Sequence, residues 1–199
     1  MNFNSLAALA AVSLSLAAPA GAATLGVADF DNPTITTFTG IGNGVQPSLV
    51  VDGNTYSAPQ GVARGVYNIT GMSGDMLNNV FEDLGSISIA FGTAVDQAGL
   101  FFGTNSPMDA RLTFFSGASI LHTSIQSSGD SEATFYGWES TGAQITDILI
   151  EDLTANSAIV VIDNVYFGDA APVPLPASLP LLAAGLLGLG YLRRRNRVQ

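Results

Sequence analysis

The chain has 199 residues and a formal net charge of −10, from 16 acidic residues, six arginines and no lysine. All the acidic residues lie between Asp29 and Asp169, where Arg64 and Arg111 are the only basic residues, so this stretch has two positive and 16 negative charges, a net of −14. That charge repels phosphate backbones and excludes nucleic acid as a partner. The absence of cysteine excludes disulfides, thiolate metal sites and cysteine catalysis.

The first 22 residues have the composition of a secretory signal peptide. An apolar run over residues 6–18 precedes Ala20-Gly21-Ala22, a pattern of small residues that signal peptidase accepts. The n-region departs from the usual pattern because it has no lysine or arginine. We expect residues 1–22 to be a signal peptide cut after Ala22 or a residue on either side. The alternative is a buried N-terminal helix or strand.

Residues 24–171 read as short strands separated by Gly, Asn, Asp and Ser. Several runs alternate apolar with polar residues, as a half-buried antiparallel sheet requires. The runs predicted as strands are 34–40, 86–92, 97–103, 110–116, 118–125, 132–139, 144–151 and 157–168. Apolar residues at 76, 77, 80, 81 and 84 have helical spacing and predict one short crossover helix over 75–85.

Short strands between turn residues favour a β-sandwich or barrel over βαβ units. The stretch "FFSGAS" predicts a hairpin turn centred on Ser116-Gly117. With about eight to ten strands, the predicted fold class is all-β. We expect a jelly-roll-like antiparallel β-sandwich with one short helix, in preference to an immunoglobulin-like sandwich.

The residues do not form a recognisable catalytic motif. His122 is the only histidine and alternates with its neighbours on a predicted strand, and the sequence has no Gly-x-Ser-x-Gly elbow, His-Glu-x-x-His motif or phosphate loop. Glu132 and Glu139 are candidates for a glycosidase acid pair, but an acidic sandwich offers many such pairs. We predict that the chain is not an enzyme. A secreted hydrolase with acidic catalysts is the alternative.

Oxygen-bearing side chains near the two ends of the domain are candidates for a calcium site. Calcium takes about six to eight oxygen ligands and needs neither histidine nor cysteine. The candidate ligands are Asp29, Asp31, Asn32, Asp163 and Asn164. The ends of a jelly-roll chain often run near each other, so a site joining these residues would pin the termini together. The alternative is turn chemistry, because Asp-Asn-Pro is itself a turn signal.

Tyr136 and Trp138 are the candidate sugar-binding residues. They are two apart in "FYGWES", so a strand would place them on one face and Phe135 on the other. On the solvent side the two rings would form a stacking surface for a sugar. On the inner side they would be core residues, which is the usual place for a single tryptophan in a sandwich.

The chain ends with an apolar segment and a cluster of arginines. Residues 179–192 would be about 21 Å long as a helix, which is short of the roughly 30 Å hydrocarbon core, so spanning needs residues back to Val173 or a thinned bilayer. The arginines that follow are Arg193, Arg194, Arg195 and Arg197. By the positive-inside rule they would stop transfer and hold the C-terminus inside, while residues 24–171 lie outside.

A proline-punctuated motif precedes this segment, formed by Val173, Pro174, Leu175, Pro176 and Ala177. The motif, the apolar segment and the arginine tail together resemble the VPLPA variant of the PEP-CTERM sorting signal. The usual core of that family is Pro-Glu-Pro, and Leu175 stands in place of the glutamate, as in the VPLPA subgroup. The resemblance, over residues 173–199, implies recognition by an exosortase-type membrane protease of a Gram-negative bacterium and removal of the tail. The alternative is a plain C-terminal membrane anchor.

The last predicted strand resembles the closing strand of jelly-roll ectodomains carried by PEP-CTERM proteins. Their Ile-Asp-Asn-x-x-Phe-Gly pattern matches Ile162, Asp163, Asn164, Phe167 and Gly168. We therefore expect an exported protein, held first at the inner membrane and then delivered to the cell surface or extracellular matrix. Its partners would be signal peptidase, the exosortase-type protease and exopolysaccharide. The alternative is a calcium- or carbohydrate-binding ectodomain that keeps its C-terminal helix.

Overall fold

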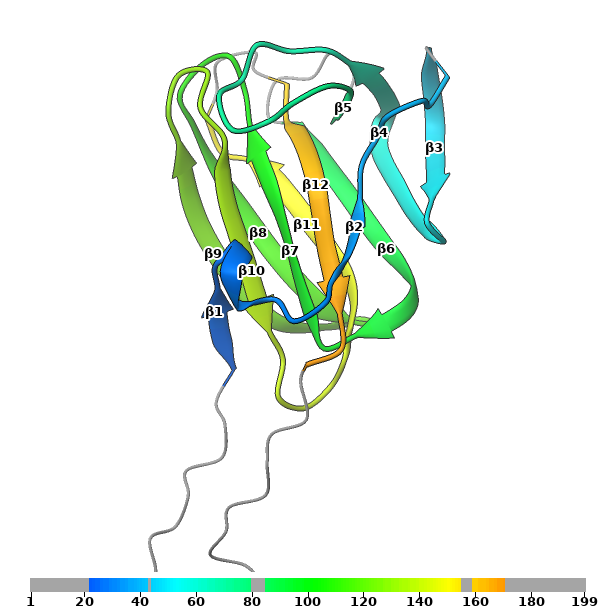
Figure 1. Ribbon diagram of the computed structural model, residues 1–199, viewed down its shortest axis with the longest axis vertical. Helices are drawn as coiled ribbons and strands as arrows, with labels where there is room; N and C mark the ends of the chain where they lie inside the picture. The colour runs from blue at the N-terminus through cyan, green and yellow to red at the C-terminus, as the bar shows by residue number, and fades with distance from the viewer. Residues whose placement is uncertain (1–21, 43, 80–84, 155–158, 171–199) are drawn as a thin grey trace, which may run out of the picture. The chain divides into compact units, whose positions relative to one another are not determined.

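Twelve β-strands pair into one curled antiparallel sheet in the part of the chain that the computed structural model describes, residues 22–42, 44–79, 85–154 and 159–170 (Figure 1). One 3-10 turn, η1 (Val27–Asp29), follows the first strand. The strands are β1 (Ala23–Leu25), β2 (Thr34–Thr36), β3 (Val45–Val51), β4 (Asn54–Gly65), β5 (Met76–Asn79), β6 (Ser86–Val95), β7 (Gln97–Gly103), β8 (Met108–Ser116), β9 (Ser119–Ser128), β10 (Thr134–Glu139), β11 (Ile145–Asp152) and β12 (Val161–Gly168).

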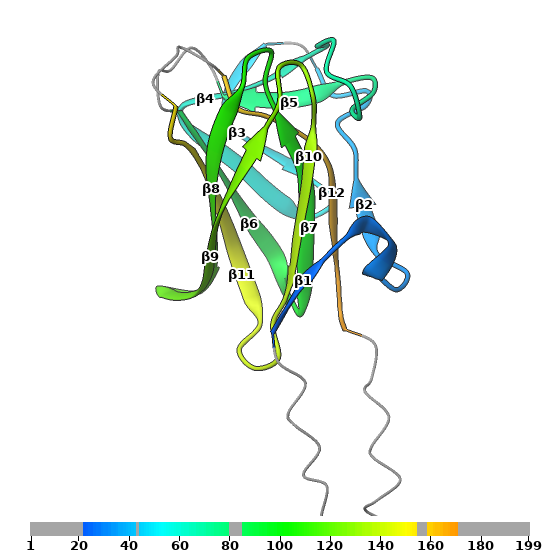
Figure 2. The same ribbon diagram turned by 90° about the vertical axis from the view of Figure 1, so that its left-hand side faces the viewer.

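The sheet curls into two facing layers, which gives a jelly-roll-like sandwich (Figure 2). The first layer has the order β1-β10-β7-β12-β2, and the second has the order β3-β4-β6-β11-β8-β9. Strand β5 pairs with β12 on one side and with β4 on the other, so it joins the two layers. At the opposite edge His122 of β9 lies 2.7 Å from the Tyr136 hydroxyl of β10. The predicted all-β fold class is confirmed.

Strand alternation places the core between the layers. In β8, Met108, Ala110, Leu112 and Phe114 are buried at alternate positions, while Asp109 between them is exposed. The inner faces of β6, β7 and β11 contribute Ile87, Ile89, Leu100, Phe102, Ile148 and Ile150, all fully buried. This period of two is what a pleated strand with one face on the core imposes.

Seven of the eight predicted strands correspond to observed strands with small shifts at their ends, and 97–103 matches β7 at both ends. The run 34–40 is the exception, because β2 ends at Thr36. The hairpin between β8 and β9 is confirmed, but its turn lies one residue later, at Gly117-Ala118, with a φ of 57° at Gly117.

The short helix predicted over 75–85 is wrong in its described part, because Met76–Asn79 forms β5. All four residues are buried, since β5 has a strand on each side. Apolar residues at 76 and 77 fit a helix and a doubly paired strand equally well. Asn78 and Asn79 have low helix propensity, and pairing with β4 and β12 decides the outcome. Residues 80–84 lie outside the described residues.

Strand β4 was not predicted, and it is the strand that links the second layer to β5. Its first part, at Thr55 to Ser57, pairs with β6, and its last part, at Val62 to Gly65, pairs with β5. Between them Pro59 lacks an amide hydrogen and Gly61 has a φ of 100°. These two residues interrupt the ladder and let β4 bend from one neighbour to the other.

The first and last strands of the described domain have their outer ends on the same side of the sandwich. Ala23 pairs with Glu139, Glu139 pairs with Gln97, and Gln97 pairs with Gly168. These four residues form one row across four strands, so Ala23 and Gly168 are three strand spacings, roughly 14 Å, apart. Figure 1 shows the start of β1 and the end of β12 at the same end of the sandwich.

We predict that Gly99→Ala lowers the stability of the domain by about 1–3 kcal/mol, because a Cβ there would overpack a filled layer. The new atom would lie 2.8 Å from Gly137 Cα and 2.9 Å from Phe135 Cζ. Gly142→Ala is the control, since a Cβ there meets nothing within 4 Å. Urea unfolding followed by Trp138 fluorescence measures both variants. Equal stability of the two would contradict the packing of β7 against β10.

Candidate functional site

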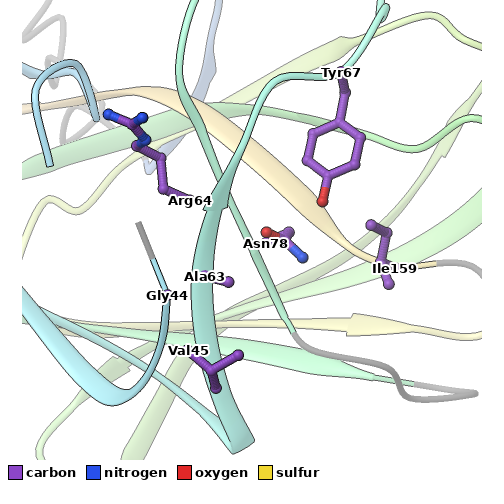
Figure 3. A pocket seen from close by; sticks show the side chains of 7 residues that line it. All are labelled: Gly44, Val45, Ala63, Arg64, Tyr67, Asn78 and Ile159. Carbon is purple, nitrogen blue, oxygen red and sulfur yellow. The ribbon is translucent and has the colours of Figure 1, made fainter. Parts of the chain in front are cut away.

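A pocket of about 290 Å³ lies on the side of β4 and β5 that faces away from the sandwich core (Figure 3). Ala63 and Asn78 are register partners there, so their side chains share one face, while Val62 and Leu77 beside them point into the core. The lining residues are Gly44, Val45, Ala63, Arg64, Tyr67, Asn78 and Ile159. The pocket exists because the bend in β4 carries its last residues onto β5.

The pocket lies toward the end of the sandwich opposite the two chain ends. Its floor, β5, pairs with Val161 and Ile162 at the start of β12, whereas the chain leaves the sheet at Gly168. Val161 and Gly168 are seven residues apart along an extended strand, roughly 23 Å.

Asn78 supplies a buried acceptor to this pocket. The residue is only 6 % exposed, and its Nδ2 donates to the backbone oxygen of Asn79 at 2.8 Å. Its Oδ1 has no hydrogen-bond partner in the described residues. In the next side chain the atoms are reversed: Asn79 Oδ1 accepts from the Val160 amide at 2.6 Å, while Asn79 Nδ2 has no hydrogen-bond partner in the described residues. An unpaired buried amide oxygen lowers the folding stability by about 1–3 kcal/mol. Packing alone therefore does not account for an asparagine at this position.

Tyr67 forms the wall opposite Asn78. Its ring folds back over the end of β4, where Gly65 makes room, since a Cβ at Gly65 would lie 2.5 Å from Tyr67 Cε2. Figure 3 shows the hydroxyl of Tyr67 directed to the side of the pocket where Asn78 lies. Partial burial raises the pKa of the Tyr67 phenol, so the hydroxyl stays protonated and can donate at neutral pH.

Arg64 closes the rim of the pocket without facing its interior. Its Nη1 lies 3.1 Å from Asp75 Oδ2, which also accepts from the Gly40 amide at 3.4 Å. In Figure 3 the guanidinium points away from Tyr67 and Asn78. The ion pair therefore fixes the end of β4, and its charges compensate each other.

The candidate calcium ligands fall into two groups that lie beside different parts of β12. Asp31 and Asn32 precede β2, which starts opposite Phe167, while Asp163 lies four residues earlier, roughly 13 Å along the strand. Asp163 is buried and accepts from the amides of Ser73 and Asn164, at 3.3 and 2.8 Å. Asp29 accepts from the Gly26 amide at 2.7 Å. No cluster of three acidic or histidine side chains suited to a metal occurs within the described ranges, and calcium stays a prediction.

The side chains of Tyr136 and Trp138 lie in the core, each 4 % exposed. They therefore do not form the solvent-facing stacking surface, and the alternative, in which both are core residues, is correct. Trp138 is covered by His122, whose ring stacks on it with centroids 5.1 Å apart and planes 7° apart. Strand β9 folds over the inner face of β10, which the sequence pattern of either strand alone does not indicate.

The acid pair considered for hydrolysis does not form. Glu132 precedes β10 and Glu139 ends it, so they are seven residues apart along an extended chain, roughly 23 Å. Glycosidase carboxylates face each other at about 5–9.5 Å. His122 packs against Trp138 and hydrogen-bonds to Tyr136, so its ring is part of the core packing.

The residues of the two predicted chain-end signals lie outside the described residues. They are residues 1–21 of the predicted signal peptide, the motif Val173 to Ala177 and the arginines from Arg193 to Arg197. Within residues 22–170, gaps excepted, the structure contains no helix with the length and apolar character to cross a membrane.

Known proteins offer distant likenesses only. No family model and no curated protein matches the chain. Among solved structures, a family 29 carbohydrate-binding module from Piromyces equi is 14 % identical, with 73 % of this chain and 97 % of that chain covered and a TM-score of 0.43. A CBM22 xylan-binding domain from Paenibacillus barcinonensis is 16 % identical (58 % and 87 % covered, TM-score 0.39). A family 61 carbohydrate-binding module in complex with β-1,4-galactotriose is 12 % identical (58 % and 88 % covered, TM-score 0.41).

We predict that Trp138 fluorescence titrates with the protonation of His122. Burial lowers the pKa of His122 from 6.5, so the unfolded chain binds this proton more readily than the folded one. Stability is therefore full above pH 6.5 and falls as the pH drops through the lowered pKa of His122. Since an imidazolium stacked on indole perturbs its emission, we expect a fluorescence midpoint below pH 6.5.

His122→Phe keeps a ring on Trp138 and removes the titrating group, so it is the control for this experiment. The variant should show a flat emission between pH 5 and pH 8, the range in which histidine titrates. A midpoint above 6.5 in the parent chain, or the same titration in the variant, would contradict the stacked arrangement.

Proposed function

We propose that this chain is an exported, non-catalytic surface or matrix protein that associates with extracellular polysaccharide. A signal peptide starts its export, and a VPLPA-type tail at residues 173–199 holds the precursor at the inner membrane. An exosortase-type protease then removes the tail at or near the motif Val173 to Ala177. The mature protein consists of the β-sandwich, delivered to the cell surface or the extracellular matrix.

The row formed by Ala23, Glu139, Gln97 and Gly168 carries this proposal. It places the start of β1 and the end of β12 at the same end of the sandwich, about three strand spacings apart. Both ends of the described domain therefore leave the sandwich at the end away from the pocket, so a tail attached to a membrane need not cover it.

The charge of the domain is consistent with this location. The stretch from Asp29 to Asp169 has a net charge of −14, and its two arginines are both in ion pairs, Arg64 with Asp75 and Arg111 with Glu151. A strongly acidic surface keeps a protein from binding anionic partners such as lipid headgroups and nucleic acid. A neutral polysaccharide is not repelled, so it is the extracellular polymer that we expect as partner.

The rival function is an ordinary membrane-anchored ectodomain, which keeps its C-terminal segment. The intact mass of the protein recovered from the native cell surface or medium separates the two. We predict a species that lacks both residues 1–22 and the arginine tail. A species that retains Arg193–Gln199 would make the tail a permanent anchor and contradict the proposed sorting.

A substitution in the motif sharpens this test. If Pro174 and Pro176 keep the approach to the membrane extended for the protease, replacing both with alanine should cause the tail to be retained. Replacing Pro172, which lies outside the motif, is the matched control and should leave processing unchanged. Equal processing of both variants would show that the motif is not what the protease recognises.

Association with polysaccharide is tested separately. We predict that the full chain co-sediments with polysaccharide purified from the native culture, and that high salt does not release it, because the binding is not ionic. A chain that stays in the supernatant at low and high salt would contradict the proposed association, whatever the result for the tail.

A further inference from the structure

We propose that the pocket lined by Tyr67, Asn78 and Ile159 binds one neutral hexose unit of the polysaccharide. This inference rests on the proposed function and assigns its ligand site to the end of the sandwich opposite Ala23 and Gly168. The site differs from the surface predicted from sequence, because Tyr136 and Trp138 lie in the core.

The acceptor of Asn78 requires a ligand that carries a hydrogen-bond donor. Its Oδ1 is buried and has no partner in the described residues, while its Nδ2 is already held by the backbone of Asn79 at 2.8 Å. The amide therefore cannot flip to present its NH₂ group without losing that bond. Because less than 1 Å² of Oδ1 is accessible, a ligand hydroxyl reaches this atom only when the wall of the pocket at Asn78 moves, and the donated bond then removes the desolvation cost of Oδ1.

Tyr67 adds an aromatic face and a second polar group. Its hydroxyl is directed toward the Asn78 side of the pocket in Figure 3, and no hydrogen bond of this hydroxyl is formed with the described residues. A phenol both donates and accepts. The pocket thus has a polar group on each of two lining residues, which suits a ligand with more than one hydroxyl.

Apart from Arg64 at its rim, the rest of the described wall is apolar. Val45, Ala63 and Ile159 present methyl groups, and none of the carboxylates in the described residues lines the pocket. A pyranose ring has hydroxyls at its edge and a patch of C–H groups on its face. It therefore matches both kinds of wall, whereas a hydrocarbon would leave Asn78 Oδ1 unpaired and costly.

Size and charge narrow the ligand further. The volume of about 290 Å³ is at the lower limit of the roughly 300–1,000 Å³ seen for small-molecule pockets, so it suits a single ring. Among the described residues of the lining Arg64 is the only charged one, and it is paired with Asp75 at 3.1 Å. A uronate carboxylate would have to compete with Asp75 for that guanidinium, so a neutral hexose is favoured over an acidic one.

The experiment is saturation-transfer NMR of D-glucose, D-galactose and D-mannose with the full chain, held in a detergent that contains no sugar. We expect at least one of the three to receive saturation from the protein. Asn78→Leu should abolish the signal. Tyr67→Phe, which removes only the hydroxyl, should weaken binding about tenfold. Tyr166→Phe is the matched control, because Tyr166 is half-buried on β12 and does not line the pocket.

Asn78→Leu also separates a binding role from a structural one. Replacing an unsatisfied buried amide by an apolar side chain of similar size should leave the stability unchanged or higher, as followed by the emission of Trp138. Lost binding in a chain that is at least as stable as the parent supports the site. If this variant does not fold, Tyr67→Phe and Tyr166→Phe still decide the question.

Two results would overturn the inference. Hexose binding that is equal in the parent, Asn78→Leu and Tyr67→Phe would place the site elsewhere. Absence of saturation transfer from all three hexoses, while the chain still co-sediments with polysaccharide, would refute this site and leave the proposed function standing. If co-sedimentation is absent too, the proposed function fails with it.

Discussion

The structure depends on the bend of β4 at Pro59 and Gly61. Because this strand pairs with β6 before the bend and with β5 after it, one continuous segment links the second layer to β5. Strand β5 then completes the connection to β12 in the first layer. A straight β4 could not pair with both β6 and β5, and β5 would lose a neighbour. The same bend places Ala63 beside Asn78 and so creates the floor of the pocket.

Polar groups in this fold are mostly satisfied near the backbone that buries them. Asp163 accepts from two backbone amides, and Asn79 accepts from Val160. Asn78 Oδ1 is one of six buried side-chain atoms without a hydrogen-bond partner in the described part of the chain, and among those six residues Asn78 is the one that lines the pocket. Departures from full satisfaction tend to occur where a protein has a function to perform. The sugar site is therefore assigned to the pocket at Asn78 and not to Tyr136 and Trp138, which lie in the core.

Sequence patterns succeeded where one face of a strand meets the core and the other meets solvent. Strand β7 was located at both ends, and β6, β8 and β11 closely, because alternation is imposed by burial on one side. They failed for β3 and β4, whose prolines Pro47 and Pro59 mimic loops, and for β5, which is buried on both faces. The Asp52-Gly53 pair, with φ values of 50° and 79°, was a hairpin signal that would have located β3 and β4.

The sequence by itself determined the all-β class, most of the strands and the expectation of export, because alternation, turn residues and chain-end composition are local properties. Only the tertiary structure decided which faces are buried. Tyr136 and Trp138 are core residues because β9 brings His122 across them, and Glu132 and Glu139 are separated by the length of β10. The pocket joins residues from β3, the end of β4, β5 and the approach to β12. Such a site depends on pairing between distant segments, which no local pattern specifies.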